Sequence, residues 1–555
     1  MIKFLKVQPI FLILRCHLSR FDKMTVVNLE FSSSLSKSDP QKQPVIIIGQ
    51  LKNLIKAKYS SVKAKLEPHV TEQVYSAALS SLHPSPTDSC SLYLNLATVA
   101  ALPVKCSRHN TPSRAHFITK LVKSATVGVD ESVVIVCRRE DVFASACAVA
   151  RAYPLYSRKT TNNLSASTKT ATVQVEFVLL SSSDDTSSMA VSNGTAEGEL
   201  VLGEGDIELL KNAAMAVRLA ARIVDTPCNE MNVDTFVQEV LTVGQALGVK
   251  STVIRGEELN DKGLGGIYGV GKAALVPPAL VVLSHLPQGA TETIAWVGKG
   301  IVYDTGGLSI KGKTSMPGMK RDCGGAAGVL GAFFTTVKAG FTQNLHAVFC
   351  LAENAVGPRS TRPDDIHTLY SGRTVEINNT DAEGRLVLSD GVSYAQRDLK
   401  ANIIVDMATL TGAQAICTGK YHAAVLTNNA EWEGAAVHAG KSSGDLVFPI
   451  LYCPELHFSE FSSAVADMKN SVTDRSNAQS SCAGLFINAH LGFDFPGVWV
   501  HIDMASPVYV GERATGYGVA ILSTLFGKFS NSEMLQSLAE HTDLELPSTK
   551  KLKRN

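Results

Sequence analysis

Residues 379–386 read Asn-Thr-Asp-Ala-Glu-Gly-Arg-Leu, which places two carboxylates and a guanidinium within five residues. Asp381 and Glu383 are two positions apart, so in an extended loop their side chains diverge and can reach two neighbouring positions. Gly384 permits a tight backbone before a helical pattern that begins near Leu386. Two interpretations remain open for this stretch alone: an ordinary helix N-cap, or the acidic part of a functional site.

Two Gly-rich segments upstream, residues 297–311 and 319–325, add further charged groups to this pattern. The candidate site residues in them are two lysines, Lys299 and Lys311, and two aspartates, Asp304 and Asp322. With residues 379–386, they resemble the M17 leucyl aminopeptidase family, whose signature Asn-Thr-Asp-Ala-Glu-Gly-Arg-Leu is present here without a change. The sequence around Asp304 and Asp322 is most similar to the aminopeptidase-like branch of that family. The resemblance covers residues 221–525.

The size and charge of the chain restrict its class. At 555 residues and 45% hydrophobic content, the chain is too long for one ordinary core, so we expect two domains or more. Lys and Arg total 52 against 51 for Asp and Glu. With charges so balanced, the protein has no net electrostatic field that would attract nucleic acid or an anionic membrane. The 11 scattered cysteines form no C-x-x-C pair, which favours a reducing compartment over a disulfide framework.

The first residues suggest a leader or an upstream extension. Residues 1–23 carry basic side chains around a short apolar run that is too short to span a membrane. Secretion fits poorly, because Asn378-Asn379-Thr380 is a glycosylation sequon within the acidic loop, where a glycan would obstruct the site. We therefore expect a cytoplasmic protein with no membrane partner.

Composition and periodicity predict the domain organisation. Strand-like and helix-like runs alternate over residues 24–180, which indicates a smaller N-terminal α/β domain. Residues 181–206 are rich in Ser, Asp, Thr and Gly and are expected to form a linker. We predict a catalytic α/β domain over residues 207–528, with a central mixed sheet flanked by helices, and a tail over residues 529–555.

The catalytic region predicts a regular α/β succession. We expect a helix over 207–225, followed by strand 293–297, helix 325–338, strand 345–351, helix 386–397 and strand 403–407. Lys299 and Asp304 follow the first of these strands. They are therefore expected at its carboxyl end, where open α/β sheets bind their ligands.

A further Gly-rich segment, residues 263–272, has the spacing of a phosphate loop through Gly266, Gly271 and Lys272. Ala273 occupies the position where Ser or Thr would hold Mg²⁺, and Pro277 follows soon after, which does not suit a helix. Nucleotide binding is therefore not predicted.

The resemblance implies a two-metal site. Four converging carboxylates could not all ionise without cations, whereas two divalent ions would restore charge balance. By resemblance, one ion is bound by Lys299, Asp304, Asp322 and Glu383, and the other by Asp304, Asp381 and Glu383. Lys299 must then be a neutral amine. Mixed nitrogen and oxygen ligands suit Zn²⁺, Mn²⁺ or Co²⁺ better than Ca²⁺.

The resemblance also implies the reaction. A water that bridges the two ions is expected to ionise near neutral pH and attack the N-terminal peptide bond of a peptide substrate. Lys311 is expected to remain protonated and to stabilise the oxyanion, and Arg385 to hold a bicarbonate that shuttles the proton. A free α-amino group on the substrate makes this an exopeptidase.

One competing hypothesis remains, and the sequence departs from the family pattern at two places. A non-catalytic scaffold or a DNA-binding role is the competing hypothesis, but the only dense basic run is residues 550–554, so no nucleic-acid partner is expected. The resemblance implies a homohexamer. Cys323 replaces a more usual methionine, and residues 482–488 differ from the usual small-residue run, so a preference for leucine does not follow.

Overall fold

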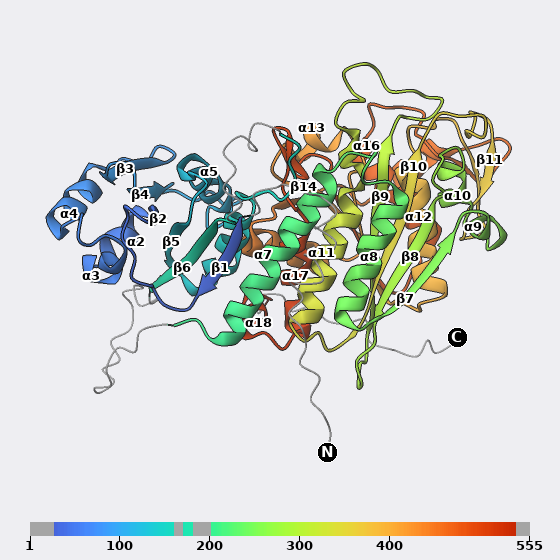
Figure 1. Cartoon of the computed structure of the whole chain (residues 1–555). Coiled ribbons are helices and arrows are strands. Elements are labelled where there is room, and N and C mark those ends of the chain that lie inside the picture. The colour runs from blue at the N-terminus through green and yellow to red at the C-terminus, as the bar shows by residue number, and fades with distance from the viewer. Residues whose placement is uncertain (1–26, 160–169, 181–200, 540–555) are drawn as a thin grey trace.

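Two mixed β-sheets with helices on both faces form two α/β domains, as the computed structural model shows (Figure 1). The structure describes residues 27–159, 170–180 and 201–539. The expected two-domain α/β fold is confirmed, with a smaller N-terminal domain and a larger domain that holds the predicted site residues. The predicted leader, most of the predicted linker and the end of the predicted tail lie outside the described residues.

The N-terminal domain is built on a six-stranded sheet. In spatial order its strands are β1 (Asn28–Ser32), β6 (Thr172–Leu180), β5 (Glu131–Arg138), β2 (Val45–Gln50), β4 (Ala97–Leu102) and β3 (Asp88–Tyr93). All neighbours are parallel except β4 and β3. Parallel strands covered on both faces carry continuous apolar runs, as the fully buried β2 does.

Alternate residues of β2 pack on opposite faces of this sheet. Ile47 joins a cluster with Leu54 of α2 (Leu51–Lys56) and residues of α4 (Glu72–Ser81). Its neighbours pack on the other side with α5 and α6, which span Ala115–Ala125 and Val142–Ala150. The side-chain period of two in an extended strand thus divides one apolar run between two cores.

A long helix, α7 (Glu204–Asp225), connects the two domains (Figure 1). It starts three residues before the predicted boundary at 207, because the Gly203 amide donates to Asp206 Oδ2 at 3.0 Å and caps the first turn. Arg218 donates to the carbonyl oxygens of Tyr153 at 2.8 Å and Val27 at 2.7 Å. These bonds fasten the helix to the N-terminal domain.

The larger domain contains an eight-stranded sheet. Its strands, in spatial order, are β15 (Val447–Pro449), β14 (Ala423–Thr427), β17 (Val498–Asp503), β13 (Ile403–Ala408), β9 (Thr293–Asp304), β10 (Asn344–Asn354), β8 (Ala279–His285) and β7 (Lys250–Arg255). The four central strands from β17 to β10 are parallel, whereas β14 and β8 run antiparallel to their inner neighbours. The predicted mixed sheet is confirmed.

Helices cover both faces of this sheet. Those packed on one face are α7, α8 (Val233–Leu247), α11 (Gly324–Lys338), α14 (Ala430–Ser443) and α17 (Val519–Leu525). Those packed on the other are α10 (Gly265–Gly271), α12 (Gly384–Arg397) and α16 (Gln479–Leu491). The strand interiors are therefore largely apolar on both sides.

One predicted boundary is wrong in a way that affects the site. Strand β9 continues to Asp304 instead of ending at residue 297, so Lys299 lies within the strand and Asp304 is its last residue. The glycines around Lys299 made this part of the sequence resemble a loop. In the structure they allow close packing, since a Cβ atom at Gly298 would lie 2.5 Å from the Cα atom of Ala326 in α11.

Two other segments take a defined place in the fold. The Gly-rich residues 263–272 contain α10, and a Cβ atom at Gly266 would lie 2.4 Å from the carbonyl oxygen of Leu386. The glycines therefore let α10 pack closely on α12. Part of the predicted tail is helix α18 (Glu533–Ala539), whose Met534 and Leu535 are buried. No described helix is both long and apolar enough to cross a membrane.

Candidate metal centre

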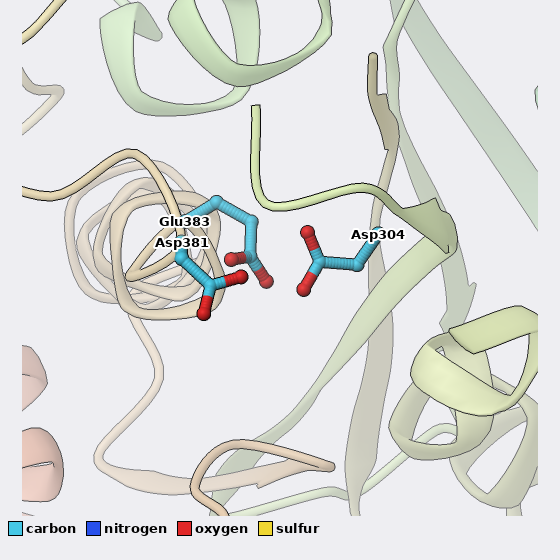
Figure 2. Close-up of side chains that lie close together, drawn as sticks. All are labelled: Asp304, Asp381 and Glu383. Atoms are coloured by element: carbon cyan, nitrogen blue, oxygen red, sulfur yellow. The ribbon is translucent and has the colours of Figure 1, made fainter. Parts of the chain in front are cut away.

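Three carboxylates converge at the carboxyl end of β9. Asp304 ends this strand, while Asp381 and Glu383 lie in the loop before α12, and the three side chains point toward one another (Figure 2). One oxygen from each lies within 4.8 Å of the others. Asp304 and Glu383 are buried, whereas the Asp381 side chain keeps 30% of its surface exposed. Asp381 therefore marks the open side of the cluster.

Lys299 forms ion pairs with both Glu383 and Asp322, the fourth predicted carboxylate. Its Nζ atom lies 2.8 Å from Asp322 Oδ2 and 2.8 Å from Glu383 Oε1, and it donates to the carbonyl oxygen of Thr409 at 3.1 Å. The lysine is fully enclosed, with 2% of its surface exposed. Gly384 makes room for it, because a Cβ atom there would lie 2.6 Å from Nζ.

Lys311 contacts the other two carboxylates. Its Nζ atom lies 2.8 Å from Asp304 Oδ2 and 2.5 Å from Asp381 Oδ1. The two lysines thus divide the four carboxylates into two pairs. The four carboxylates outnumber the two ammonium groups, which leaves the cluster able to attract further cations.

Burial and mutual repulsion shift the ionisation of these groups. Burial, and then the negative charge of Asp304, raises the pKa of Glu383 to about 8. Burial is also the main cause of the raised pKa values of Asp322 and Asp381. Burial alone would lower the pKa of Lys299, but Asp322 and Glu383 outweigh it and raise this pKa. Among the protein's own groups Lys299 is therefore an ammonium, and a metal ion must displace its proton.

The loop after β9 is fastened to the loop before α12. Two glycines with positive φ, 84° at Gly306 and 61° at Gly307, turn the chain sharply after Asp304. The Thr380 hydroxyl donates to the Gly306 carbonyl at 2.6 Å. Asn354, at the end of β10, donates from Nδ2 to Asp304 Oδ1 at 2.8 Å and to the Thr380 carbonyl at 3.0 Å. These bonds fix the position of Asp304 relative to the loop that carries Asp381 and Glu383.

Asp322 comes from a separate element, the short helix η4 (Met319–Cys323). Its Oδ1 atom accepts a hydrogen bond from the Thr409 hydroxyl at 2.7 Å, and Thr409 follows the end of β13. Lys320 of the same helix donates to the carbonyl oxygen of Asp225, the last residue of α7. The Asp322 carboxylate is thus positioned by both the sheet and the interdomain helix.

Arg385 forms no ion pair with the four carboxylates within the described part of the chain. Its Nη1 atom donates to the carbonyl oxygen of Asn470 at 3.0 Å, and its guanidinium lies 5.9 Å and 6.0 Å from the ring centres of Phe461 and Phe486. Burial lowers the pKa of Arg385 to about 10. Among the described residues its buried Nε atom has no hydrogen-bond partner, so this donor is available to an anion.

The donor set fits divalent metal ions. Carboxylate oxygens are hard ligands and a lysine nitrogen is a borderline one. This combination suits Zn²⁺ or Mn²⁺ better than a soft metal. The close approach of Asp304, Asp381 and Glu383 provides oxygen atoms that could be shared between two ions. All seven residues predicted from the sequence lie in or next to this region, six as the ion-paired cluster and Arg385 beside it.

Three supporting residues were not predicted from the sequence: Asn354, Thr409 and Asn470. Asn354 and Thr409 lie at the ends of parallel strands next to β9, so the rule that ligands bind at carboxyl ends of strands could have found them. Asn470 follows the two-residue strand β16 (Met468–Lys469), and no local pattern marks it.

Two family models match the chain. Residues 218–523 match the model described as "Cytosol aminopeptidase family, catalytic domain", and residues 43–162 match "M17 aminopeptidase N-terminal domain 2". The mouse protein "Probable aminopeptidase NPEPL1" is 62% identical over 524 residues, which cover 94% of this chain and 97% of that protein. "Leucine aminopeptidase 1" of Caenorhabditis elegans is 47% identical over 449 residues, covering 80% of this chain and 86% of that protein.

Solved structures agree with these matches. The structure of Caenorhabditis elegans leucine aminopeptidase aligns with a TM-score of 0.84 at 42% identity, covering 92% of this chain and 100% of that one. Trypanosoma brucei leucyl aminopeptidase in complex with bestatin aligns with a TM-score of 0.77 at 34% identity, covering 94% of this chain and 100% of that one. The likeness therefore extends over both domains.

Proposed function

The chain belongs to the M17 cytosol aminopeptidase family, and from this premise we propose that it is a dinuclear metal-dependent enzyme that releases N-terminal residues from peptides. The observation that carries the proposal is the convergence of Asp304, Asp381 and Glu383 within 4.8 Å, with a lysine against each half of the cluster. A scaffold without activity would not need to keep these mutually repelling, buried groups together.

The metal-holding residues are proposed to be Lys299, Asp304, Asp322, Asp381 and Glu383. Bound there, two divalent ions such as Zn²⁺ or Mn²⁺ supply Lewis acidity and lower the pKa of water toward neutrality. Lys299 contributes its nitrogen once its proton has left. The buried positions of Lys299 and Glu383 exclude bulk water from that side of the site.

Lys311 is proposed to stabilise negative charge on the substrate. Its pKa is raised above the usual value, because Asp304 and other nearby carboxylates outweigh the opposing effect of burial, so it remains an ammonium at neutral pH. An ammonium on the exposed side of the cluster can donate to the carbonyl oxygen of the scissile bond as that oxygen becomes an oxyanion. One such donor contributes a rate factor of roughly 100 to 1,000.

Arg385 is proposed to bind a bicarbonate that moves the proton to the leaving amine. The unpartnered Nε atom and the permanent charge of a guanidinium support this role, because a planar anion can accept from two of its donors. Phe461 and Phe486 beside the guanidinium limit its motion and reduce competition from water.

Substrate specificity for a free amino terminus provides the test. Purified protein supplied with Mn²⁺ or Zn²⁺ should release amino acids from a panel of aminoacyl amides. The matched N-acetylated amides should not be cleaved, since their amino groups can neither bind a metal nor pair with a carboxylate. Equal cleavage of the blocked amides, or no cleavage of any amide at full metal occupancy, would reject the aminopeptidase assignment.

We also propose a homohexamer in the cytoplasm. Both parts rest on the family likeness and on a sequence without a disulfide framework. Light scattering under the conditions of maximal activity should give six times the 59.2 kDa chain mass. A monomer mass under those conditions would contradict the hexamer and leave the aminopeptidase proposal intact.

A further inference from the structure

We propose that Asn470 is a positioning residue that shapes the loop carrying Asp381 and Glu383 and links it to Arg385. The inference rests on the proposed function, since it concerns how this chain prepares its metal centre. Asn470 has no exposed surface and lies just after β16, which pairs with β12 (Thr374–Glu376). It is therefore fixed by a small sheet beside the loop, outside the eight-stranded sheet.

The Asn470 side chain uses both ends of its amide on one turn of backbone. Its Oδ1 atom accepts from the amide nitrogens of Asn378 at 3.0 Å and Asn379 at 3.2 Å. Its Nδ2 atom donates to the carbonyl oxygens of Asn379 at 2.7 Å and Ala382 at 3.3 Å. Two donors and two acceptors of the loop are thus satisfied by one buried side chain, which sets the path of the backbone from 378 to 382.

The bond to Ala382 is the one closest to the metal-binding groups. Ala382 lies between Asp381 and Glu383, so fixing its carbonyl fixes the peptide units that carry both carboxylates. Side chains with buried, fully used hydrogen-bonding groups around metal ligands keep those ligands in position. Asn470 touches neither carboxylate and acts through the backbone.

The main chain of Asn470 extends the same support to Arg385. Its carbonyl oxygen accepts from Arg385 Nη1 at 3.0 Å, and its amide donates to the carbonyl of Glu376 at 3.0 Å. One residue therefore sets the spacing between the carboxylate loop and the guanidinium proposed to bind an anion. Replacing the side chain removes the loop bonds and leaves the bond to Arg385 available.

Asn378 offers a matched control. Its exposed side chain makes the reciprocal bonds, accepting from the Ser471 amide at 2.9 Å and donating to the Ser471 carbonyl at 3.2 Å. These bonds join the same two segments, but they do not reach the turn around Ala382. Asn378→Ala should therefore reproduce any general loosening of the two segments without disturbing the carboxylates.

The experiment measures metal binding directly. Wild type, Asn470→Ala, Asn470→Asp and Asn378→Ala are stripped with a chelator and titrated with Mn²⁺ in a calorimeter, and the Tm of each stripped protein is recorded. We expect Asn470→Ala to raise the Mn²⁺ Kd roughly 10- to 100-fold. Asn378→Ala should keep the wild-type Kd. Saturating Mn²⁺ should restore much of the kcat of Asn470→Ala with little change in KM, because every ligand is still present.

A wild-type Kd in Asn470→Ala, or an equal loss in Asn378→Ala, would overturn the inference. If Asn470→Ala does not fold, Asn470→Asp decides the matter. It keeps the shape and the Oδ1 acceptor but places an oxygen against the carbonyls of Asn379 and Ala382, so its Kd should rise as well, and an unchanged Kd would overturn the inference. Failure of the wild type itself to bind Mn²⁺ would instead reject the proposed function.

Discussion

A Cβ atom on residue 384 would lie 2.6 Å from both Cε and Nζ of Lys299, so the absence of a side chain at Gly384 allows Lys299 to reach Glu383. Gly384 is the first residue of α12, directly after Glu383. The helix that carries a predicted metal ligand can therefore start against the buried lysine of β9. This approach explains why a glycine follows the two carboxylates in the sequence.

Gly384→Ala should consequently impair metal binding more than folding. The clashing atoms are the far end of a flexible side chain, so Lys299 can move aside at a modest energetic cost, but it then loses its place beside Asp322 and Glu383. We expect a Mn²⁺ Kd raised roughly 10- to 100-fold, with a small change in the Tm of the stripped protein. Gly434→Ala in α14, where a Cβ atom would meet open space, is the control and should leave the Kd unchanged.

The two lysines should respond differently to truncation. Lys299→Ala removes a proposed ligand, so it should lower occupancy of one metal, and excess metal should partly restore turnover. Lys311→Ala removes an ammonium that repels cations from Asp304 and Asp381, so metal content should stay intact while kcat falls about 100-fold or more. Metal analysis and kcat across a metal titration distinguish the two. Loss of metal in Lys311→Ala, or retention of both ions in Lys299→Ala, would show that the roles are assigned wrongly.

Metal binding should weaken as the pH falls. Glu383, with its pKa raised to about 8, and Lys299, with its pKa also raised, hold protons that a metal ion must displace. Lower pH favours the protonated forms, so the Kd for Mn²⁺ should increase as pH decreases through about 8, and binding should release protons. Calorimetry in buffers of different ionisation enthalpy counts these protons. Glu383→Gln should release fewer, and a count equal to that of wild type would remove Glu383 from this explanation.

Much of the fold could be predicted from local patterns. The predicted helix ends at 225, 338 and 397 agree with the ends of α7, α11 and α12, and Pro227 and Gly340 mark the first two of them. The end of β9 could not be predicted in this way. Glycines beside Lys299 commonly mark a loop, and only the packing of α11 against Gly298 explains why they belong to a strand here.

The site, too, could be predicted only in part from local sequence patterns. The charged residues could be identified because carboxylates and lysines are costly to bury and their spacing matches a family signature. The distribution of ion pairs, with Lys299 against Asp322 and Glu383 and Lys311 against the other pair, depends on contacts between distant segments. Asn470 is the clearest case. An asparagine after a two-residue strand has no local pattern, and its importance arises from the loop that folds onto it.

The most direct test of the central claim is a metal titration of chelator-stripped wild-type protein, with turnover of an aminoacyl amide measured at every step. The account predicts no turnover in the stripped protein, full turnover at two equivalents of Mn²⁺ or Zn²⁺ per chain, and loss of both metal and turnover in Asp381→Asn and Glu383→Gln. Turnover without bound metal, or near-wild-type turnover with both ions retained in either variant, would contradict the assignment of these carboxylates to a dinuclear aminopeptidase site.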